Sequence, residues 1–292
     1  MKKIIVYDSE GFCFGVKKAI QTVNKAIEEG KENILIYGDI IHNKAVINDF
    51  EKRGVKTIHT VDEIIKGSTV IIRTHGIPPS EEQDIRSKAK EVIDTTCPLV
   101  KAAQRKVKKI VRGGGIAIII GKKDHPEVIA EMGYGGSKAF VVSSVDDVNI
   151  ESIKGEKIGI IAQTTFKEEK FKEISEFILK HSTNVKIYDT ICPITRERQK
   201  DIVRLSKDCD LMIILGGKNS SNTRVLYEKA KEVQPETLYL ENEKEFPVEV
   251  LKKVNTICLG TGTSTPPFAI KDFVSFLETK IGEREEVEIK WN

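Results

Sequence analysis

Short apolar runs alternate along the chain with segments of helical period. Six runs have strand length, and each is followed by Gly or polar residues. They cover residues 34–37, 70–72, 116–120, 158–161, 211–215 and 256–259. Apolar residues at helical spacing predict helices over residues 16–29, 98–111, 168–180, 195–206 and 222–233. Continuous apolar strands that alternate with helices predict an α/β protein with mostly parallel sheets covered on both faces.

Residues at the expected element ends support this pattern. Gly30 and the glycines at 113–115 suit left-handed positions that end helices. Thr60 and Glu63 have the spacing of a capping box, which starts a helix.

A repeated cysteine motif divides the chain into thirds. Residues 94–99 read Asp-Thr-Thr-Cys-Pro-Leu and residues 189–194 read Asp-Thr-Ile-Cys-Pro-Ile, 95 positions apart. Cys13 lies between Gly11 and Gly15, 84 positions before Cys97. We therefore predict three similar α/β units over residues 14–97, 98–192 and 193–292, the last completed by a strand within residues 1–13. The alternative is one continuous, doubly wound sheet.

Each third also supplies two polar loops directly after its apolar strands. Ligands of open parallel sheets bind beyond the carboxyl ends of the strands. Six such loops, converging from three units, would line a closed polar cavity around the cysteines. They begin at Gly38, Arg73, Gly121, Ala162, Gly216 and Gly260.

Cysteines from three distant segments favour a metal–sulfur cluster at their meeting point, since thiolates bind soft metals strongly. No C-x-x-C pair is present, which argues against a zinc finger. A 4Fe–4S cluster normally has four cysteine ligands, so three would leave one iron open to a substrate oxygen. Cys209 and Cys258 lie in other contexts, and we predict that they are small buried residues.

The loop side chains suit an anion and a proton donor. Donors to a phosphate group would be His42, His75, His125, Ser220, Ser221, Asn222 and Ser264. Glu127 is the carboxyl among these donors and is the candidate for proton transfer. Each feature also has a structural explanation, as a buried histidine, a helix N-cap or a turn. Together they favour reductive removal of an oxygen group from a small phosphorylated molecule.

Composition narrows the class of protein. The chain has 292 residues, 31% of them charged, with a net charge of +3, so the basic excess of a dedicated nucleic-acid binder is missing. No apolar run approaches the ~20 residues of a membrane span. Five cysteines, an odd number, favour reduced or metal-bound thiols over a disulfide framework. We expect a cytoplasmic protein.

As an ordered set, these motifs resemble the family of 4-hydroxy-3-methylbut-2-enyl diphosphate reductases, also called the LytB/IspH family, over essentially the whole chain. The resemblance is based on the segments 11–16, 42–43, 73–76, 94–98, 125–127, 163–165, 189–193 and 219–222. The resemblance implies an oxidoreductase at the last step of the methylerythritol phosphate route to isoprenoids. It also implies a pseudo-three-fold trefoil of the three units around an oxygen-sensitive 4Fe–4S cluster.

The resemblance also assigns roles to residues. Cys13, Cys97 and Cys192 would hold the cluster, whose fourth iron is open to the substrate hydroxyl. The diphosphate would be bound by the histidines and loop residues named above, and Glu127, with Thr164 and His125, would relay protons. Two electrons and two protons would give water with isopentenyl and dimethylallyl diphosphates. The chain departs from the family at Thr263 and Thr265, where alanines are more usual beside the retained Ser264.

The resemblance further implies an external one-electron donor, ferredoxin or flavodoxin. A basic stretch follows Cys97, and we hypothesise that part of it docks an acidic donor; a solvated helix face is the alternative. Its members are Lys101, Arg105, Lys106, Lys108, Lys109 and Arg112. We expect a monomer with no nucleic-acid or membrane partner.

Two other functions fit parts of the pattern. A cluster-dependent hydro-lyase acting on a small phosphorylated substrate would remove water without a reductant. An iron–sulfur sensor or carrier would usually have a fully ligated cluster and would need no anion cavity. The six polar loops favour an enzyme.

Overall fold

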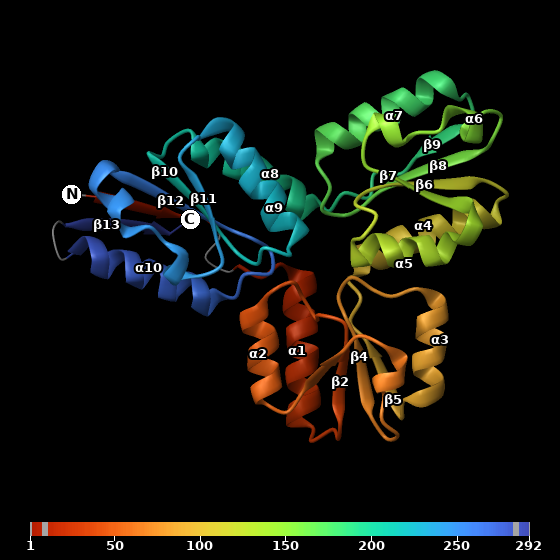
Figure 1. Cartoon of the computed structure of the whole chain (residues 1–292), viewed down its shortest axis with the longest axis horizontal. Coiled ribbons are helices and arrows are strands. Elements are labelled where there is room, and N and C mark those ends of the chain that lie inside the picture. The colour runs from red at the N-terminus through yellow and green to blue at the C-terminus, as the bar shows by residue number, and fades with distance from the viewer. Residues whose placement is uncertain (1, 8–10, 283–285, 292) are drawn as a thin grey trace. The chain divides into compact units, whose positions relative to one another are not determined.

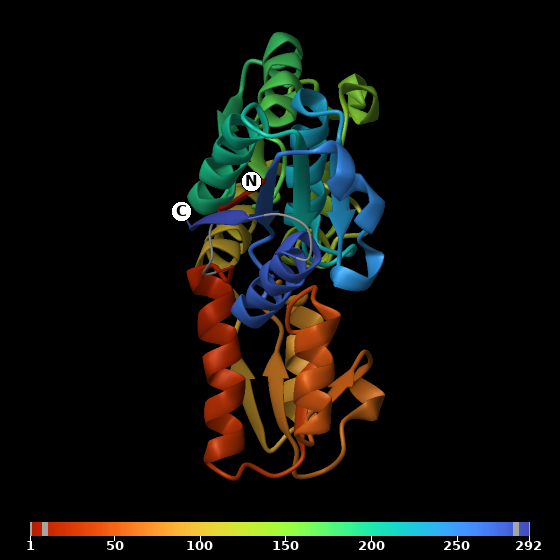
Figure 2. The same cartoon turned by 90° about the vertical axis from the view of Figure 1, so that its left-hand side faces the viewer.

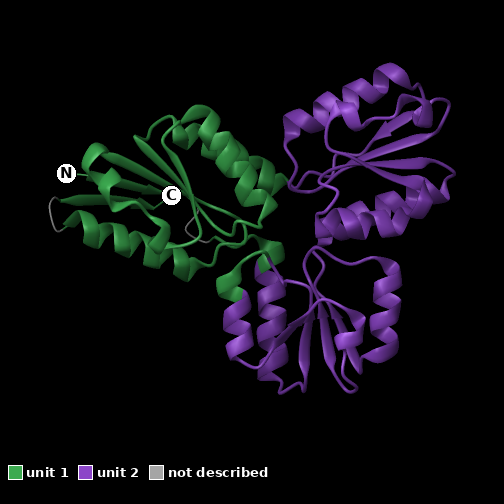
Figure 3. Ribbon diagram, viewed as in Figure 1, with its two compact units in different colours: residues 1–16, 42–46, 193–292 green, residues 17–41, 47–192 purple. Residues whose placement is uncertain are grey.

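Three parallel sheets with interleaved helices form the protein, as a computed structural model of residues 2–7, 11–282 and 286–291 shows (Figure 1). The chain divides into two compact units (Figure 3). One comprises residues 1–16, 42–46 and 193–292, and holds a five-stranded sheet. The other comprises residues 17–41 and 47–192, and holds two four-stranded sheets.

The first four-stranded sheet has the order β3-β2-β4-β5, and its neighbouring strands are parallel. The strands are β2 (Ile34–Tyr37), β3 (Lys56–Ile58), β4 (Thr69–Ile72) and β5 (Glu91–Asp94). Helices α1 (Phe14–Glu28) and α2 (Lys44–Lys52) run along one face, and α3 (Pro79–Lys88) runs along the other (Figures 1 and 2).

The second four-stranded sheet repeats this topology in the order β7-β6-β8-β9. The strands are β6 (Ile116–Ile120), β7 (Ala139–Val142), β8 (Ile158–Ala162) and β9 (Val185–Ile187). Helices α4 (Pro98–Arg112) and α5 (Pro126–Gly135) pack together on one face. The short α6 (Ile150–Ile153) and α7 (Glu168–His181) lie on the other (Figure 1).

The five-stranded sheet has the order β11-β10-β12-β1-β13. Its strands are β1 (Lys2–Val6), β10 (Leu211–Leu215), β11 (Thr237–Leu240), β12 (Thr256–Thr261) and β13 (Val287–Trp291). Helices α8 (Pro193–Ser206) and α9 (Ser221–Val233) cover one face, and α10 (Pro267–Gly282) covers the other (Figure 1). β1 pairs with β12 in parallel, so it takes the position that β5 and β9 hold in the other sheets.

The structure confirms the α/β class and the parallel sheets, and three separate sheets rule out one continuous sheet in the described part of the chain. The six apolar runs are the central strands, and three have the predicted bounds. Strand β1 lies within the predicted residues 1–13, whereas β3, β5, β7, β9, β11 and β13 were not predicted, because they are short and partly exposed, as in β5 (Glu-Val-Ile-Asp). The unit boundaries at Cys97 and Cys192 stay a prediction.

Short 3-10 helices fill several connections. The predicted capping box is present at η1 (Val61–Glu63), where the Thr60 amide donates to Glu63 Oε1 at 3.0 Å. The others are η2 (Gly136–Lys138), η3 (Val145–Asp147), η4 (Glu243–Glu245) and η5 (Val248–Lys253). Across the described residues, every helix is too short or too polar to cross a membrane.

The core lies on the two faces of each sheet. Ile118, Ile160 and Ile174 pack on one face of the second four-stranded sheet, while Ile119 and Val107 pack on the other. Full burial of an aliphatic side chain contributes about 1.5–3 kcal/mol, so these layers hold the strand ends, and the loops that follow them, in fixed positions.

The prediction of reduced or metal-bound thiols was wrong for Cys209 and Cys258. Both are buried, as expected, but a disulfide joins them across a Cα–Cα distance of 5.8 Å. Parallel strands β10 and β12 are neighbours, and Met212 is in register with Cys258, so the chain just before β10 passes close to that cysteine. The sequence does not reveal which strands are neighbours, and so the pairing was missed.

Candidate active site

The three cysteines of the motif occupy equivalent positions in the three sheets. Each is followed at once by a long helix, α1, α4 or α8. Each backbone N–H donates to the carbonyl of a threonine that lies two residues beyond the end of a central strand. These bonds join Cys97 to Thr74 (2.9 Å), Cys192 to Thr164 (2.8 Å) and Cys13 to Thr263 (3.2 Å). The cysteine loops are thus one structural motif used three times.

The Asp-Thr pairs before Cys97 and Cys192 explain how these loops are held. The Asp94 carboxylate accepts from the Thr96 amide at 2.8 Å, and the Asp189 carboxylate accepts from the Ile191 amide at 3.2 Å. The Thr95 hydroxyl donates to the carbonyl of Ile72, the last residue of β4, at 2.5 Å. The Thr190 hydroxyl donates to the carbonyl of Ala162, the last residue of β8, at 2.6 Å. The repeated hexapeptide therefore encodes a repeated turn.

Each cysteine lies at the N-terminal end of its helix, where the macrodipole favours negative charge. Proline begins the helix after Cys97 and after Cys192, which suits the first helical position because its missing N–H would have no partner there. Partly exposed cysteines at such positions can bind a soft metal as thiolates.

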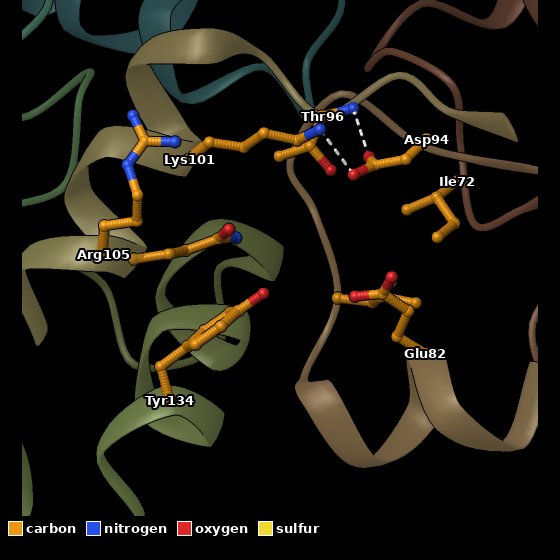
Figure 4. Close-up of a pocket in the computed structure, with 9 residues that line it drawn as sticks. Ile72, Glu82, Asp94, Thr96, Lys101, Arg105 and Tyr134 are labelled. Carbon is orange, nitrogen blue, oxygen red and sulfur yellow. Dashed lines mark hydrogen bonds and ion pairs between the residues drawn. The ribbon is translucent and has the colours of Figure 1, made fainter. Parts of the chain in front are cut away.

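A small pocket of about 160 Å³ beside the Cys97 loop shows how that loop is braced (Figure 4). Lys101 in the first turn of α4 forms an ion pair with Asp94 at 2.6 Å, which ties the helix to the end of β5. Glu82 of α3, Arg105 of α4 and Tyr134 of α5 complete the wall (Figure 4). Cys97 is therefore fixed between two elements that are held together.

In the unit with two sheets, a continuous set of contacts connects the Cys97 and Cys192 loops. Thr164, whose carbonyl accepts from Cys192, donates its amide to Glu127 Oε1 at 2.6 Å and its hydroxyl to Oε2 at 2.8 Å. The Glu127 amide donates to His125 Nδ1 at 3.2 Å. The His125 ring meets the His75 ring edge to face, with centroids 5.4 Å apart, and His75 follows Thr74.

Glu127 is held in a state suited to proton transfer. Its side chain is 1% exposed, and this burial raises the pKa of the carboxyl to about 7, although the two Thr164 hydrogen bonds act in the opposite direction. A group with a pKa near 7 can both give and take a proton near neutral pH. Because His125 Nδ1 accepts a hydrogen bond, a neutral His125 carries its ring proton on Nε2.

The other unit brings together the remaining predicted anion donors. Ser220 caps α9 by accepting from the Thr223 amide at 3.3 Å, and Ser221 and Asn222 form the first turn. Ser264 Oγ donates to the His42 carbonyl at 3.5 Å. A Cβ on Gly217 would lie 2.3 Å from that same carbonyl, so glycine is required for the two loops to meet.

Asn222 is the most informative of these residues. It is 3% exposed, and neither its amide nitrogen nor its amide oxygen finds a hydrogen-bond partner among the described residues. An unsatisfied buried amide is costly, so this position at a helix N-terminus is suited to a polar ligand.

Cys13 is fixed to the loop that follows β12. Gly11 has φ +65°, and a Cβ there would lie 2.1 Å from the Thr265 carbonyl oxygen. Arg198 of α8 donates to the Gly11 carbonyl at 2.8 Å. The extra hydroxyl of Thr265 has a structural use, since it donates to the Leu215 carbonyl at 2.9 Å inside the core.

The amino-acid sequence is similar to those of known proteins. Residues 4–278 match the model of the family described as LytB protein. The chain belongs to the LytB family. Its sequence is 40% identical over 281 residues to 4-hydroxy-3-methylbut-2-enyl diphosphate reductase of Aquifex aeolicus (strain VF5), covering 95% of this LytB chain and 96% of that protein. It is 37% identical to the reductase of Thermoanaerobacter sp. (strain X514), with 96% and 98% covered.

Solved structures of two reductases are also similar to this LytB-family chain. It superposes with a TM-score of 0.91 on the E-1-hydroxy-2-methyl-but-2-enyl-4-diphosphate reductase of Plasmodium falciparum, at 26% identity, covering 100% of this chain and 92% of that one. A structure of (E)-4-hydroxy-3-methyl-but-2-enyl diphosphate reductase, described as the terminal enzyme of the non-mevalonate pathway, gives a TM-score of 0.71 at 39% identity, with 96% and 100% covered.

Two features of this LytB-family site were not predicted from the sequence. The threonine carbonyls that hold the cysteine loops act through the backbone, and side-chain type does not reveal such contacts. Glu131 is a second buried carboxyl on α5, and its spacing of four residues from Glu127 was the available signal.

Proposed function

We propose that the chain catalyses the reductive dehydroxylation of 4-hydroxy-3-methylbut-2-enyl diphosphate to isopentenyl and dimethylallyl diphosphates, with two external electrons and two protons. The observation that carries this proposal is the shared geometry of the three cysteine loops, each hydrogen-bonded to an equivalent threonine carbonyl. The substrate is inferred from the similar proteins, which are named as reductases of this diphosphate.

Cys13, Cys97 and Cys192 would hold a 4Fe–4S cluster. Three thiol side chains, each at a helix N-terminus and each on an equivalent backbone hydrogen bond, fit this group in donor type and number. When bound, a cluster with three cysteine ligands supplies electrons and a Lewis-acidic iron.

The diphosphate would be bound by polar side chains of the strand-end loops. Asn222, with its unsatisfied amide, and the N-terminus of α9 provide the strongest support for anion binding. The proposed set is His42, His75, His125, Ser220, Ser221, Asn222, Thr164 and Ser264.

Glu127 would deliver the proton that converts the leaving hydroxyl into water. The Thr164 amide and hydroxyl fix both of its oxygens, and His125 begins the same helix. Burial keeps the carboxyl largely protonated below pH 7, where it can act as a general acid.

Anaerobic reconstitution tests this function. The protein reconstituted with iron and sulfide should bind about four irons per chain and should reduce 4-hydroxy-3-methylbut-2-enyl diphosphate with a one-electron reductant. Cys97→Ser should lose iron and activity, whereas Cys209→Ser, outside the motif, should keep both. Full iron content in Cys97→Ser would contradict the ligand assignment, and turnover without reductant would favour the hydro-lyase.

The electrons would come from an acidic one-electron carrier such as ferredoxin or flavodoxin. Helix α4, which starts directly after Cys97, contains six basic residues and no acidic residue. Arg105, Lys108, Lys109 and Arg112 are exposed, whereas Lys101 is paired with Asp94. An exposed basic helix that begins at a proposed cluster ligand suits an acidic partner that must come close to the cluster.

A further inference from the structure

One peptide group in the loop between β10 and α9 is bound at both ends by side chains of another strand. The Gly217–Lys218 peptide begins a turn in which the Ser220 amide donates to the Gly217 carbonyl at 3.0 Å. The Tyr239 hydroxyl, from β11, donates to the same carbonyl at 2.6 Å. The Lys218 amide donates to Oε1 of Glu241, the residue directly after β11, at 2.8 Å. The orientation of this peptide is therefore fixed from outside the loop.

This peptide needs outside support because a glycine precedes it. Glycine has the widest range of backbone angles, so the peptide groups beside it rotate more readily than those beside other residues. A larger residue is excluded at Gly217, since a Cβ there would lie 2.3 Å from the His42 carbonyl oxygen. The glycine that lets two loops meet therefore leaves the next peptide less restricted, and the hydrogen bonds with Tyr239 and Glu241 remove this freedom.

The ring of Tyr239 is itself held by two contacts. The Tyr227 ring of α9 stacks on it, with centroids 5.4 Å apart, and the Lys218 ammonium group lies 4.4 Å from its centroid. The same ammonium group pairs with Glu245 at 3.2 Å. Burial raises the pKa of the Tyr239 hydroxyl, so this group stays protonated and remains a donor near neutral pH. Tyr239 thus connects β11 to the loop and also to α9.

We propose that Tyr239 is a positioning residue for anion binding, which holds the Gly217–Lys218 peptide so that the start of α9 is ready to receive the diphosphate. The turn that begins with this peptide ends at Ser220, the N-cap of α9, and the first turn of that helix contains the unsatisfied amide of Asn222. A loop that is fixed before binding loses little conformational entropy when the ligand arrives. The inference rests on the proposed diphosphate site.

Pyrophosphate binding to the protein reconstituted with iron and sulfide tests this role. Tyr239→Phe keeps the ring and removes the hydroxyl, so calorimetry should show about tenfold weaker pyrophosphate binding than in wild type, the most that one neutral hydrogen bond is expected to contribute. KM for the diphosphate substrate should rise by the same factor, while kcat should change by less than about twofold, because only binding is affected. A merely structural role would lower stability to urea and leave pyrophosphate affinity and KM unchanged.

Three further variants separate the hydroxyl from its surroundings. Tyr227→Phe removes the hydroxyl of the stacked ring, leaves the bond to the Gly217 carbonyl in place, and should keep the wild-type affinity. Glu241→Ala frees the other end of the peptide and should weaken pyrophosphate binding by at least about tenfold, because its hydrogen bond is charge-assisted. Glu241→Gln keeps an oxygen acceptor and should restore most of the affinity. Equal pyrophosphate affinity of wild type and Tyr239→Phe would overturn the proposal.

Amide hydrogen exchange of the pyrophosphate-free protein tests the positioning step by itself. In Tyr239→Phe the amides of Lys218 and Ser220 should exchange about tenfold faster than in wild type, because the turn opens more often. The same amides should exchange at the wild-type rate in Tyr227→Phe. Unchanged exchange in Tyr239→Phe would overturn the proposal, whatever the substrate of the protein is. If wild type bound no pyrophosphate, the proposed function would be wrong and this proposal would fall with it, so the two failures give different results.

Discussion

Thr164 joins two parts of the candidate site through three of its own atoms. Its carbonyl accepts from the Cys192 amide, while its amide and hydroxyl donate to the two oxygens of Glu127. A shift of the Cys192 loop would therefore move Glu127 as well. This connection explains how Glu127 and Cys192, which are 65 positions apart in the sequence, are held in a fixed arrangement.

Glu127→Gln should remove proton delivery and leave the rest of the site intact. The amide keeps the size of the side chain, so cluster absorbance and diphosphate affinity should match those of wild type. Turnover should fall by about 10²- to 10⁴-fold, the usual contribution of general acid catalysis. Single-turnover kinetics with the reduced protein would measure this, and near-normal rates would remove Glu127 from the mechanism.

Glu131 should make stability depend on pH. Its pKa in the folded protein is raised above the unfolded value, so folding is favoured most below about pH 4 and this contribution is lost as pH rises. Glu131→Gln lacks the contribution. Relative to the variant, wild type should therefore lose up to about 1.4 kcal/mol of unfolding free energy per pH unit above pH 5.

Urea unfolding at pH 5.5 and pH 8 would measure this difference, with Glu82→Gln as the control at a partly exposed carboxyl. A constant difference between wild type and Glu131→Gln at the two pH values would mean that Glu131 does not change its proton affinity on folding.

At the scale of elements, central strands and long helices were predictable, while the contacts between elements were not. Residues 116–120 and 211–215 form strands because five consecutive apolar residues can be covered on both faces of a sheet. By contrast, β9 has the exposed residues Lys186 and Ile187, and its identity as a strand depends on pairing with β8. The burial of Glu131 depends in the same way on how α5 packs.

The disulfide between Cys209 and Cys258 should stabilise the five-stranded sheet. It closes a loop across 49 positions, and the loss of chain entropy in the unfolded state corresponds to about 4 kcal/mol. A Cys209→Ala/Cys258→Ala double variant should unfold at lower urea concentration by that amount and should keep its cluster. Wild type treated with a thiol reductant is the matched comparison, and an unchanged midpoint in both would show that the bridge contributes nothing.

The whole molecule uses one strand–helix arrangement three times, and this was predictable because the cysteine motif repeats at intervals close to a third of the chain. Cys97 and Cys192 lie in similar hexapeptides, whereas Cys13 lacks this sequence and shares only structural features, its position before a helix and its amide bond to a threonine carbonyl. The placement of β1 beside β12 shows why the third copy is less visible: its last strand and its cysteine come from the opposite end of the chain.

The charge distribution over α4 gives a prediction about the electron donor. The Lys106 ammonium group lies 5.0 Å from the centroid of the Tyr188 ring and makes a cation–π contact with it, whereas Lys108 and Lys109 are exposed. Lys108→Glu/Lys109→Glu should slow reduction by an acidic ferredoxin about tenfold at low ionic strength and much less at high salt, because screening removes long-range attraction. Stopped-flow reduction at two salt concentrations would measure it.

The matched control is Lys66→Glu/Lys180→Glu, which makes the same change in net charge at exposed positions outside α4. If attraction came only from overall charge, both double variants would slow reduction equally. If α4 is the docking surface, the control should keep most of the wild-type rate, since short-range charge complementarity is lost only in the α4 variant. A small uncharged reductant should reduce all three proteins at the same rate, because it gains nothing from steering.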